Sequence, residues 1–406
     1  LRSVKERCEK LQGGCDITSK EGQGTVPSSY GAASDSGVNK YNFGLASNPY
    51  TSLMIVENKI GNPDLTWEKA KKMNVGVDIN LFNNCLTASF DIFKEKRNNI
   101  LANRSTSPMI IGANLPAYNF GEMENRGWEM DLNFRHHIQD FHYWARFNYS
   151  FARNEIIYMD EVQKRYDYQM TTGRRKNQFF GLIFDGYYNS WEEINALDRP
   201  KSSWSGNQLQ PGDVKYVDVN QDGVIDDYDM VPIGYTPVPE IIYGFSFGAQ
   251  YKGFDFSILF QGADNVSIKY FGRSMWPFAK GEESAKSLIK ERWTQERYEA
   301  GEKITFPRLS LNPNGETDHN YRPSTLWIRD ASYLRLKNLE VGYTFTGGFV
   351  KRLNLNSVRL YFNGSNLFTW TDVVDLDPEA PSRSGNVEIN TYPLQKVYNI
   401  GLNINF

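Results

Sequence analysis

Apolar and polar residues alternate along the last thirteen residues of the chain, 394–406. Alternation with a period of two predicts a β-strand with one apolar and one polar face, and only Lys396 and Val397 interrupt it here. The same pattern recurs in eight segments upstream, which predicts nine strands in total. They span Val75–Leu81, Leu86–Ile92, Trp128–Phe134, Phe141–Phe151, Ile241–Ala249, Phe254–Phe260, Leu334–Phe345, Val358–Phe362 and Leu394–Phe406.

The connections between these strands alternate in length. Short turns join the first strand to the second, the third to the fourth, the fifth to the sixth and the seventh to the eighth, whereas about 25, 85, 70 and 25 residues separate the other pairs. Outer-membrane β-barrels have short periplasmic turns and long external loops. We therefore predict an all-β fold, a transmembrane antiparallel β-barrel with long external loops at about 157–240 and 267–330.

The polar faces of the predicted strands carry charge. In a barrel these side chains face a polar lumen, whereas in a soluble sandwich they would lie on the outside. The alternation of the seventh strand changes phase near Asn338, which predicts a β-bulge. The charged positions include Asp78, Asp91, Asp131, Arg146, Asp255 and Arg359.

Composition narrows the possible classes. The net charge of −3 and the mean hydropathy of −0.56 argue against a nucleic-acid binder and against a helical membrane protein. A run of about 18 apolar residues, long enough for a transmembrane helix, does not occur. The 25 Phe, 24 Tyr and 9 Trp fit the aromatic girdles of a barrel, although a large soluble β protein can also be rich in aromatic residues.

The number of strands predicts a part of a larger barrel. If the short turns are periplasmic, the ninth strand ends in the periplasm and the first strand begins outside. A complete barrel begins inside and has an even number of strands. The nine strands, or ten with a further strand near Tyr41–Ala46 or Leu53–Glu57, are therefore expected to be its C-terminal portion. The start at Leu1, without a signal peptide, fits a processed or truncated beginning.

One motif in the longest loop carries chemistry of its own. Residues 218–229 read D-x-N-x-D-G-x-I-D-x-x-D, which matches the spacing of a calcium loop, with Gly223 at the sharp turn. An aspartate stands at the last position instead of the longer glutamate. The alternative is an acidic turn that binds no ion. The motif predicts structural calcium, which would hold an external loop. The predicted ligands are Asp218, Asn220, Asp222, the carbonyl of Val224, Asp226 and Asp229.

Weaker signals have simpler interpretations. The three histidines near residue 140 lack regular zinc-ligand spacing, a short basic run fits a solvated loop, and one acidic pair does not have the geometry of a glycosidase site. Loop aromatic residues would stack on sugar rings, pack within the loops or contact a lid. Cys8 and Cys15 would pair in an oxidising compartment, or would stay free like Cys85. The histidines are His136, His137 and His142, the basic run is Arg174, Arg175 and Lys176, and the acidic pair is Glu192 and Glu193. The loop aromatic residues are Tyr187, Tyr188, Trp191, Trp204 and Trp276.

Five long sequence words, in order and together with the terminal strand, resemble one protein family. The chain is similar to the C-terminal part of SusC/RagA-type TonB-dependent transporters of the Bacteroidetes outer membrane, from about Asn62 to Phe406, whereas residues 1–61 match less sharply. The words are NPDLTWEKAKKMNVGVD (62–78), FNNCLTASFDIFKEKRNNIL (82–101), NFGEMENRGWEMDLNF (119–134), DASYLRLKNLEVGYTF (330–345) and VRLYFNGSNLFTW (358–370).

The resemblance implies a barrel of about 22 strands around an N-terminal plug domain that is absent from this sequence. It divides the chain into an external loop and possible strand (1–61) and a barrel portion (62–406). It also implies import of oligosaccharides or peptides, driven by TonB through the missing region, with a SusD-like surface lipoprotein and without enzymatic activity. Two alternatives stay open: a barrel adhesin or receptor without transport, and a soluble calcium-binding β protein that acts on glycans.

Overall fold

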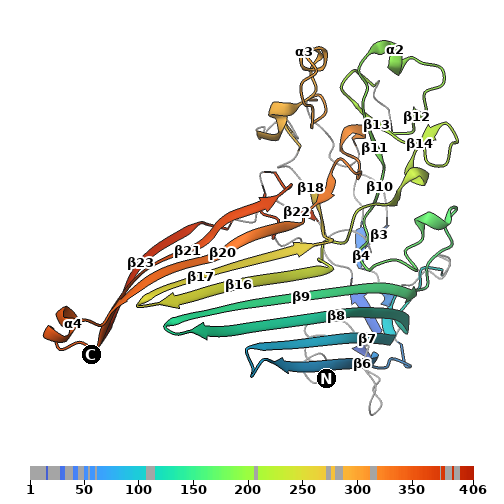
Figure 1. Ribbon diagram of the computed structural model, residues 1–406. Coiled ribbons are helices and arrows are strands. Elements are labelled where there is room, and N and C mark those ends of the chain that lie inside the picture. The colour runs from blue at the N-terminus through green and yellow to red at the C-terminus, as the bar shows by residue number, and fades with distance from the viewer. Residues whose placement is uncertain are drawn as a thin grey trace.

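Nine long strands form one antiparallel sheet, and all nine predicted strands are confirmed. The computed structural model describes residues 62–106, 115–204, 209–270, 276–278, 287–310, 318–374, 376–379 and 394–406, and only the backbone of six short strands elsewhere. The sheet follows chain order from one edge to the other (Figure 1). Its strands are β6 (Lys69–Leu81), β7 (Leu86–Ala102), β8 (Tyr118–Ile138), β9 (Phe141–Tyr158), β16 (Ile241–Tyr251), β17 (Phe254–Asp264), β20 (Tyr333–Phe345), β21 (Ser357–Thr371) and β23 (Val397–Asn405).

The register places apolar residues on one face across the whole sheet. In one such row, each residue pairs with the next one on the neighbouring strand. The row consists of Ile79, Ala88, Leu132, Phe147, Phe245, Phe260, Leu336 and Phe368. Because side chains alternate between the faces, the polar positions of every strand gather on the opposite face. The bulge predicted near Asn338 is confirmed, since the pairing of β20 with β17 and with β21 slips there. The bulge keeps Leu336 and Leu339 on the apolar face.

Short turns lie at one end of the sheet and long loops at the other, as the alternation of connection lengths predicts (Figure 1). The turn between β16 and β17 consists of Lys252 and Gly253, both with positive φ, which is the twist that a two-residue hairpin requires. Helix α4 (Gly348–Arg352) lies in the turn between β20 and β21. The sheet is open in the structure, with β6 and β23 as its edges. Among the described residues, the helices are too short or too polar to span a bilayer.

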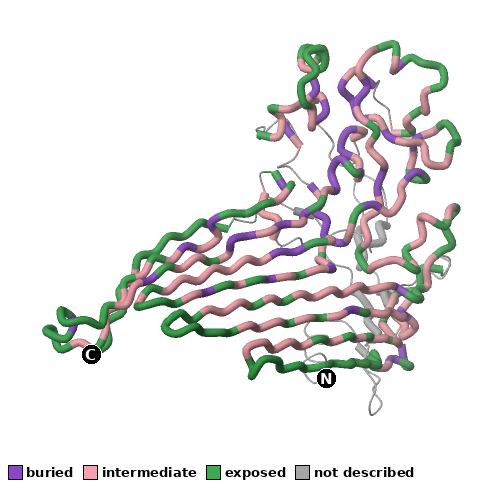
Figure 2. The backbone as a smooth tube through the Cα atoms, viewed as in Figure 1, coloured by how far each residue is buried: buried purple, intermediate pink, exposed green. Residues whose placement is uncertain are grey.

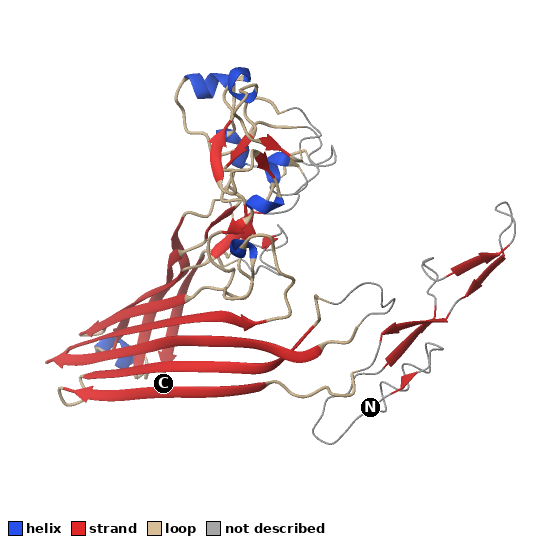
Figure 3. Ribbon diagram, turned by 90° about the vertical axis from the view of Figure 1, so that its right-hand side faces the viewer, coloured by secondary structure: helices blue, strands red, loops and turns tan. Residues whose placement is uncertain are grey.

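The two longest loops fold together beyond one end of the sheet, next to the segment that follows β21 (Figure 3). We call the described residues within 159–240, 265–332 and 372–379 the loop cap. Figure 2 shows that buried residues concentrate there rather than in the sheet. Its core contains Trp293, Phe306, Tyr321 and Trp327 from one loop and Val214 from the other. The loop cap therefore has its own hydrophobic core, which gives it a defined shape.

Short strands and helices also lie in the loop cap, and further short strands lie among the N-terminal residues. Strands β3 and β4 pair with each other and β5 pairs with β2, so neither stretch proposed for a tenth barrel strand lies in the nine-stranded sheet. The bounds are β1 (Cys15–Asp16), β2 (Ser28–Ala32), β3 (Lys40–Phe43), β4 (Tyr50–Leu53), β5 (Ile55–Lys59), β10 (Phe180–Gly181), β11 (Phe184–Tyr187), β12 (Lys201–Ser202), β13 (Val214–Tyr216), β14 (Val224–Ile225), β15 (Val231–Pro232), β18 (Ser267–Tyr270), β19 (Ile328–Asp330), β22 (Asn386–Val387), α2 (Trp191–Ile194), α3 (Gln295–Glu299), and the 3-10 helices η2 (Asp167–Gln169), η3 (Asp227–Asp229), η5 (Ser287–Glu291) and η7 (His319–Tyr321).

Candidate functional site

The apolar face of the sheet is exposed. Ile400, Val75 and Phe245 expose 81, 66 and 42% of their surfaces, although each lies within a long strand. Soluble proteins rarely expose a continuous apolar patch larger than roughly a few hundred Å². This face therefore needs an apolar environment. Its other exposed residues include Val77, Ile79, Leu81, Phe90, Ile92, Phe247, Phe254, Val341, Phe345, Leu360, Phe362, Phe368, Leu402 and Ile404.

The polar face carries bonded networks of charged and amide side chains. The Arg359 guanidinium on β21 pairs with Asp255 on β17 and, at 2.6 Å, with Glu340 on β20. Near the other edge of the sheet, Ser89 donates a hydrogen bond of 2.6 Å to Asp78. Such networks are expected where water is present on this face, and they hold neighbouring strands in register.

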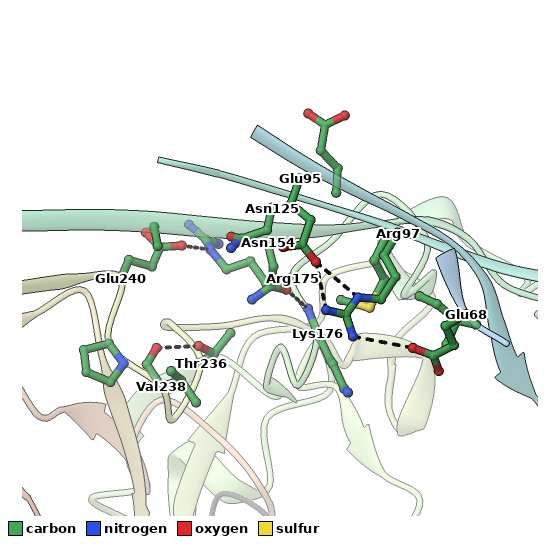
Figure 4. A pocket seen from close by; sticks show the side chains of 15 residues that line it. Glu68, Glu95, Arg97, Asn125, Asn154, Arg175, Lys176, Thr236, Val238 and Glu240 are labelled. Atoms are coloured by element: carbon green, nitrogen blue, oxygen red, sulfur yellow. Dashed lines mark hydrogen bonds and ion pairs between the residues drawn. The ribbon is translucent and has the colours of Figure 1, made fainter. Parts of the chain in front are cut away.

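A pocket of about 590 Å³ lies where the polar face meets the loop cap (Figure 4). Strands β7, β8 and β9 form one wall, with Arg97, Asn125 and Asn154, and loop segments around residues 175 and 238 form the other. The volume lies within the range of small-molecule sites, about 300–1,000 Å³. We call this space the rim pocket. Sequence reasoning missed it because its wall comes from three strands and two distant loop segments.

A buried carboxylate fixes the loop side of the rim pocket. Glu240 receives hydrogen bonds of 3.0 and 2.8 Å from Arg153 and also pairs with Arg175. Burial would raise the pKa of Glu240, but the bonds from both arginines outweigh this effect and lower it. Glu240 is therefore ionised and joins β9 to the loop segment that contains Arg175. The basic run that includes Arg175 was predicted to lie in a solvated loop. The prediction is wrong for Arg175, because its guanidinium pairs with the buried carboxylate of Glu240.

The calcium motif folds as a closed loop that follows β13 and ends with η3. Both oxygens of Asp218 accept backbone hydrogen bonds, of 2.7 Å from Gln221 and 2.8 Å from Gly223. Gly223 has a φ of +82°, in the left-handed region that glycine occupies at little cost. Strand β14 bonds to β12 through the carbonyls of Gly223 and Ile225, so the carbonyl of Val224 lies on the opposite side of the strand.

The last position of the motif is the most buried one. The Asp229 side chain accepts backbone hydrogen bonds from Val219, at 2.8 Å, and from Asp226, at 2.9 Å. Burial raises the pKa of Asp229, and the neighbouring charge of Asp218 raises it further. Within the part of the chain that the structure describes, no basic side chain forms an ion pair with either aspartate.

Across the described ranges, no group of three or more His, Cys, Asp and Glu side chains is placed to hold a metal ion. The predicted calcium ligands also include an amide oxygen, from Asn220, and a backbone carbonyl, from Val224. Asn220 Nδ2 donates a 3.0 Å bond to Asp222, and Asp226 accepts a 2.7 Å bond from the amide of Tyr228. Calcium binding at this loop stays a prediction.

The calcium motif is anchored to the rest of the loop cap on two sides. Tyr168 and Gln169 donate hydrogen bonds of 2.7 and 2.8 Å to the carbonyls of Tyr228 and Asp227. On the other side, Ser202 of β12 contacts Nδ1 of His319 at 3.0 Å. Burial lowers the pKa of His319, so its imidazole is neutral near neutral pH.

Most of the loop aromatic residues pack inside the loop cap. Tyr187 belongs to the main core, and Tyr188 packs with Ile194 and Leu209 in a smaller cluster. Trp204 and Trp276 lie against the main core, whereas Trp191 is 53% exposed. Four of these five residues therefore have packing contacts, which leaves Trp191 as the accessible aromatic side chain of the set.

The remaining candidate residues do not converge on a site. His136, His137 and His142 lie exposed at the hairpin between β8 and β9. Glu192 and Glu193 lie in the first turn of helix α2, where Glu193 pairs with Lys215 at 2.6 Å.

The structure describes the side chain of one cysteine. Cys85 is a free thiol in the turn before β7. Cys8 and the side chain of Cys15 lie outside the described residues, so their pairing stays a prediction.

Comparison with known proteins decides the family. The sequence model of the TonB-dependent receptor-like β-barrel family matches residues 23–367, which is most of the 406-residue chain. The chain belongs to this family. The resemblance to SusC/RagA-type members is also confirmed: TonB-dependent receptor SusC of Bacteroides thetaiotaomicron is 25% identical over 354 residues, 86% of this chain and 33% of SusC.

Two further relatives agree with this result. TonB-dependent receptor P3 of Formosa agariphila is 27% identical over 370 residues, 87% of this chain and 35% of the receptor. The RagAB peptide importer in its open-open state has the same fold, with a TM-score of 0.66 and 24% identity, over 94% of this chain and 40% of the solved chain. The TonB-dependent receptor chain described here thus spans about a third of the length of the curated relatives that it matches.

Proposed function

We propose that this chain is part of an outer-membrane importer that takes up oligosaccharides or peptides with energy from TonB. The observation that carries the proposal is the two-faced sheet, apolar and exposed on one side and charged and bonded on the other. Lipid would cover the apolar face, and the polar face would line a water-filled lumen. The short turns would lie in the periplasm, and the loop cap would lie outside the cell.

The open edges of the sheet support a larger barrel. An unpaired strand edge in lipid leaves backbone N–H and C=O groups without partners, which the bilayer does not tolerate. Further strands next to β6 and β23 would close the barrel, and a plug domain would fill its lumen. The loop cap has a defined shape because it has its own core, and it offers a surface for a SusD-like surface lipoprotein. Such an importer moves its substrate without covalent chemistry.

The test is to purify the receptor from its native outer membrane in mild detergent and identify what accompanies it. The proposal expects a stoichiometric surface lipoprotein, and substrate uptake by cells that stops when TonB is deleted. If the receptor is repeatedly isolated alone and cells lacking TonB take up substrate normally, a receptor or adhesin without transport becomes the better assignment. Recovery in the soluble fraction without detergent would favour the glycan-active soluble protein.

We also propose that the calcium motif binds calcium and so stabilises the loop cap. Support comes from the buried carboxylate of Asp229, which has no basic partner among the described residues, and from the oxygen donors around it. Chemically, calcium would supply the positive charge that this cluster lacks, held by the six predicted ligands. External calcium is plentiful, so a structural role fits better than a switch.

Calcium removal is expected to loosen the loop cap. At a calcium concentration tenfold above the dissociation constant, binding contributes about 1.4 kcal/mol, so chelation should speed proteolysis of residues 159–240 about tenfold. Asp222→Asn should show the fast rate with or without calcium, since it removes a ligand charge at an exposed position. Asp198→Asn, an exposed acid outside the motif, is the control. Equal cleavage rates with calcium and with chelator in the unmodified receptor would contradict the proposal.

A further inference from the structure

The rim pocket contains one charged side chain that has no ion-pair partner among the described residues. Its arginines are paired: Arg97 with Glu95 at 2.8 Å and with Glu68 at 3.5 Å, and Arg175 with Glu240. The Lys176 side chain lines the pocket, is exposed, and forms no ion pair with any described residue. Figure 4 shows it extending away from the carboxylates of Glu95 and Glu240. The pocket therefore offers a free ammonium group to a ligand.

The position of Lys176 is set by the fold. Its backbone N–H donates a 2.7 Å hydrogen bond to Asn154 on β9, and the Glu240 pairs with Arg153 and Arg175 fix the adjacent residue. The ammonium group is consequently attached to a backbone that is tied to the sheet. A positioned donor loses less entropy on binding a ligand than one on a free loop.

The remaining walls suit aliphatic groups rather than sugar rings. Ile100, Met123, Val238 and Pro239 line the rim pocket, and its described lining includes no Phe, Tyr or Trp. Sugar rings commonly pack their C–H groups on the electron-rich faces of aromatic side chains, and this pocket offers no such face. Aliphatic side chains next to a free ammonium group instead match a short apolar peptide that carries a carboxylate.

We propose that the rim pocket binds a peptide segment, with a ligand carboxylate on the ammonium group of Lys176 and aliphatic side chains against Met123 and Val238. This inference rests on the proposed importer, since it names the substrate class of the lumen that the polar face would line. The carboxylate is the terminal one or that of an acidic side chain. A carboxylated oligosaccharide would share the charge but not the aliphatic contacts.

The test is isothermal titration of the receptor purified from its native outer membrane, with two probes. One is the peptide acetyl-Ala-Val-Leu-Ala with a free carboxyl terminus, and the other is its C-terminal amide. Lys176→Gln should weaken binding of the free acid about tenfold, because a charge-assisted bond is lost, and leave binding of the amide unchanged. Lys164→Gln removes an exposed lysine outside the pocket and should bind both probes as the unmodified receptor does.

Several outcomes would overturn the proposal. Equal binding of the free acid by Lys176→Gln and the unmodified receptor would exclude the carboxylate contact. Binding of an oligogalacturonate but of neither peptide would assign the pocket to anionic glycans instead. TonB-dependent uptake without peptide binding would overturn this inference alone, whereas peptide binding without any TonB-dependent uptake would support the pocket and contradict the proposed import.

Discussion

Trp327→Ala is expected to unfold the loop cap while the sheet keeps its fold. The indole is 3% exposed, lies 5.4 Å from the rings of both Phe306 and Tyr321, and donates a 2.8 Å hydrogen bond to the carbonyl of Asn320. Truncation of a buried Trp costs about 3–5 kcal/mol. Because Trp327 belongs to the same core as Val214, which lies in the other long loop, the loss falls on both long loops at once.

Limited proteolysis of the receptor in outer-membrane vesicles measures this effect. Cleavage within the loop cap should become faster by on the order of 100-fold or more, since local opening controls access to the protease. Retained heat-modifiable migration on gels would show that the strands are still folded. Trp191→Ala, at a residue 53% exposed, should change the rate little. Unaltered cleavage in Trp327→Ala would mean that the loop cap does not depend on this core.

Phe245→Arg is expected to prevent stable assembly in the membrane. Phe245 lies midway along β16 on the apolar face, is 42% exposed, and stacks on Phe260 at 4.7 Å. An arginine at the bilayer midplane costs about 2–4 kcal/mol on a lipid-facing position. The amount of folded receptor in the outer membrane, measured by surface labelling and heat-modifiable migration, should therefore fall sharply.

A matched substitution on the opposite face tests which face of the sheet lipid covers. Ser257 lies on the neighbouring strand β17, where it is paired with Gly248 and Glu340 on the polar face. Ser257→Arg introduces the same charge beside a carboxylate in a watery lumen, so the level of folded receptor should stay near normal. A tolerated Phe245→Arg together with a damaging Ser257→Arg would reverse the two faces and contradict the barrel orientation.

The nine strands were predictable because the two faces of each strand differ in polarity. The alternation of Val75, Val77 and Ile79, or of Leu402 and Ile404, is a local signal that needs no knowledge of partners. The bulge near Asn338 was predictable for the same reason, since a shift of one residue reverses the pattern. The strand ends were less visible: β8 extends from Tyr118 to Ile138, because pairing with β7 and β9 continues beyond the alternating stretch.

The sequence by itself determined the strands, the order of short and long connections, the calcium-like spacing of residues 218–229 and the family resemblance. All of these are patterns of neighbouring residues. Only the tertiary structure placed Trp327 and Val214 in one core and Arg175 beside Glu240, because these pairs lie far apart in the chain. The rim pocket likewise depends on the tertiary structure. Its walls exist only when β7, β8 and β9 pair and the loop segments around Lys176 and Val238 fold back on them, so no local pattern encodes it.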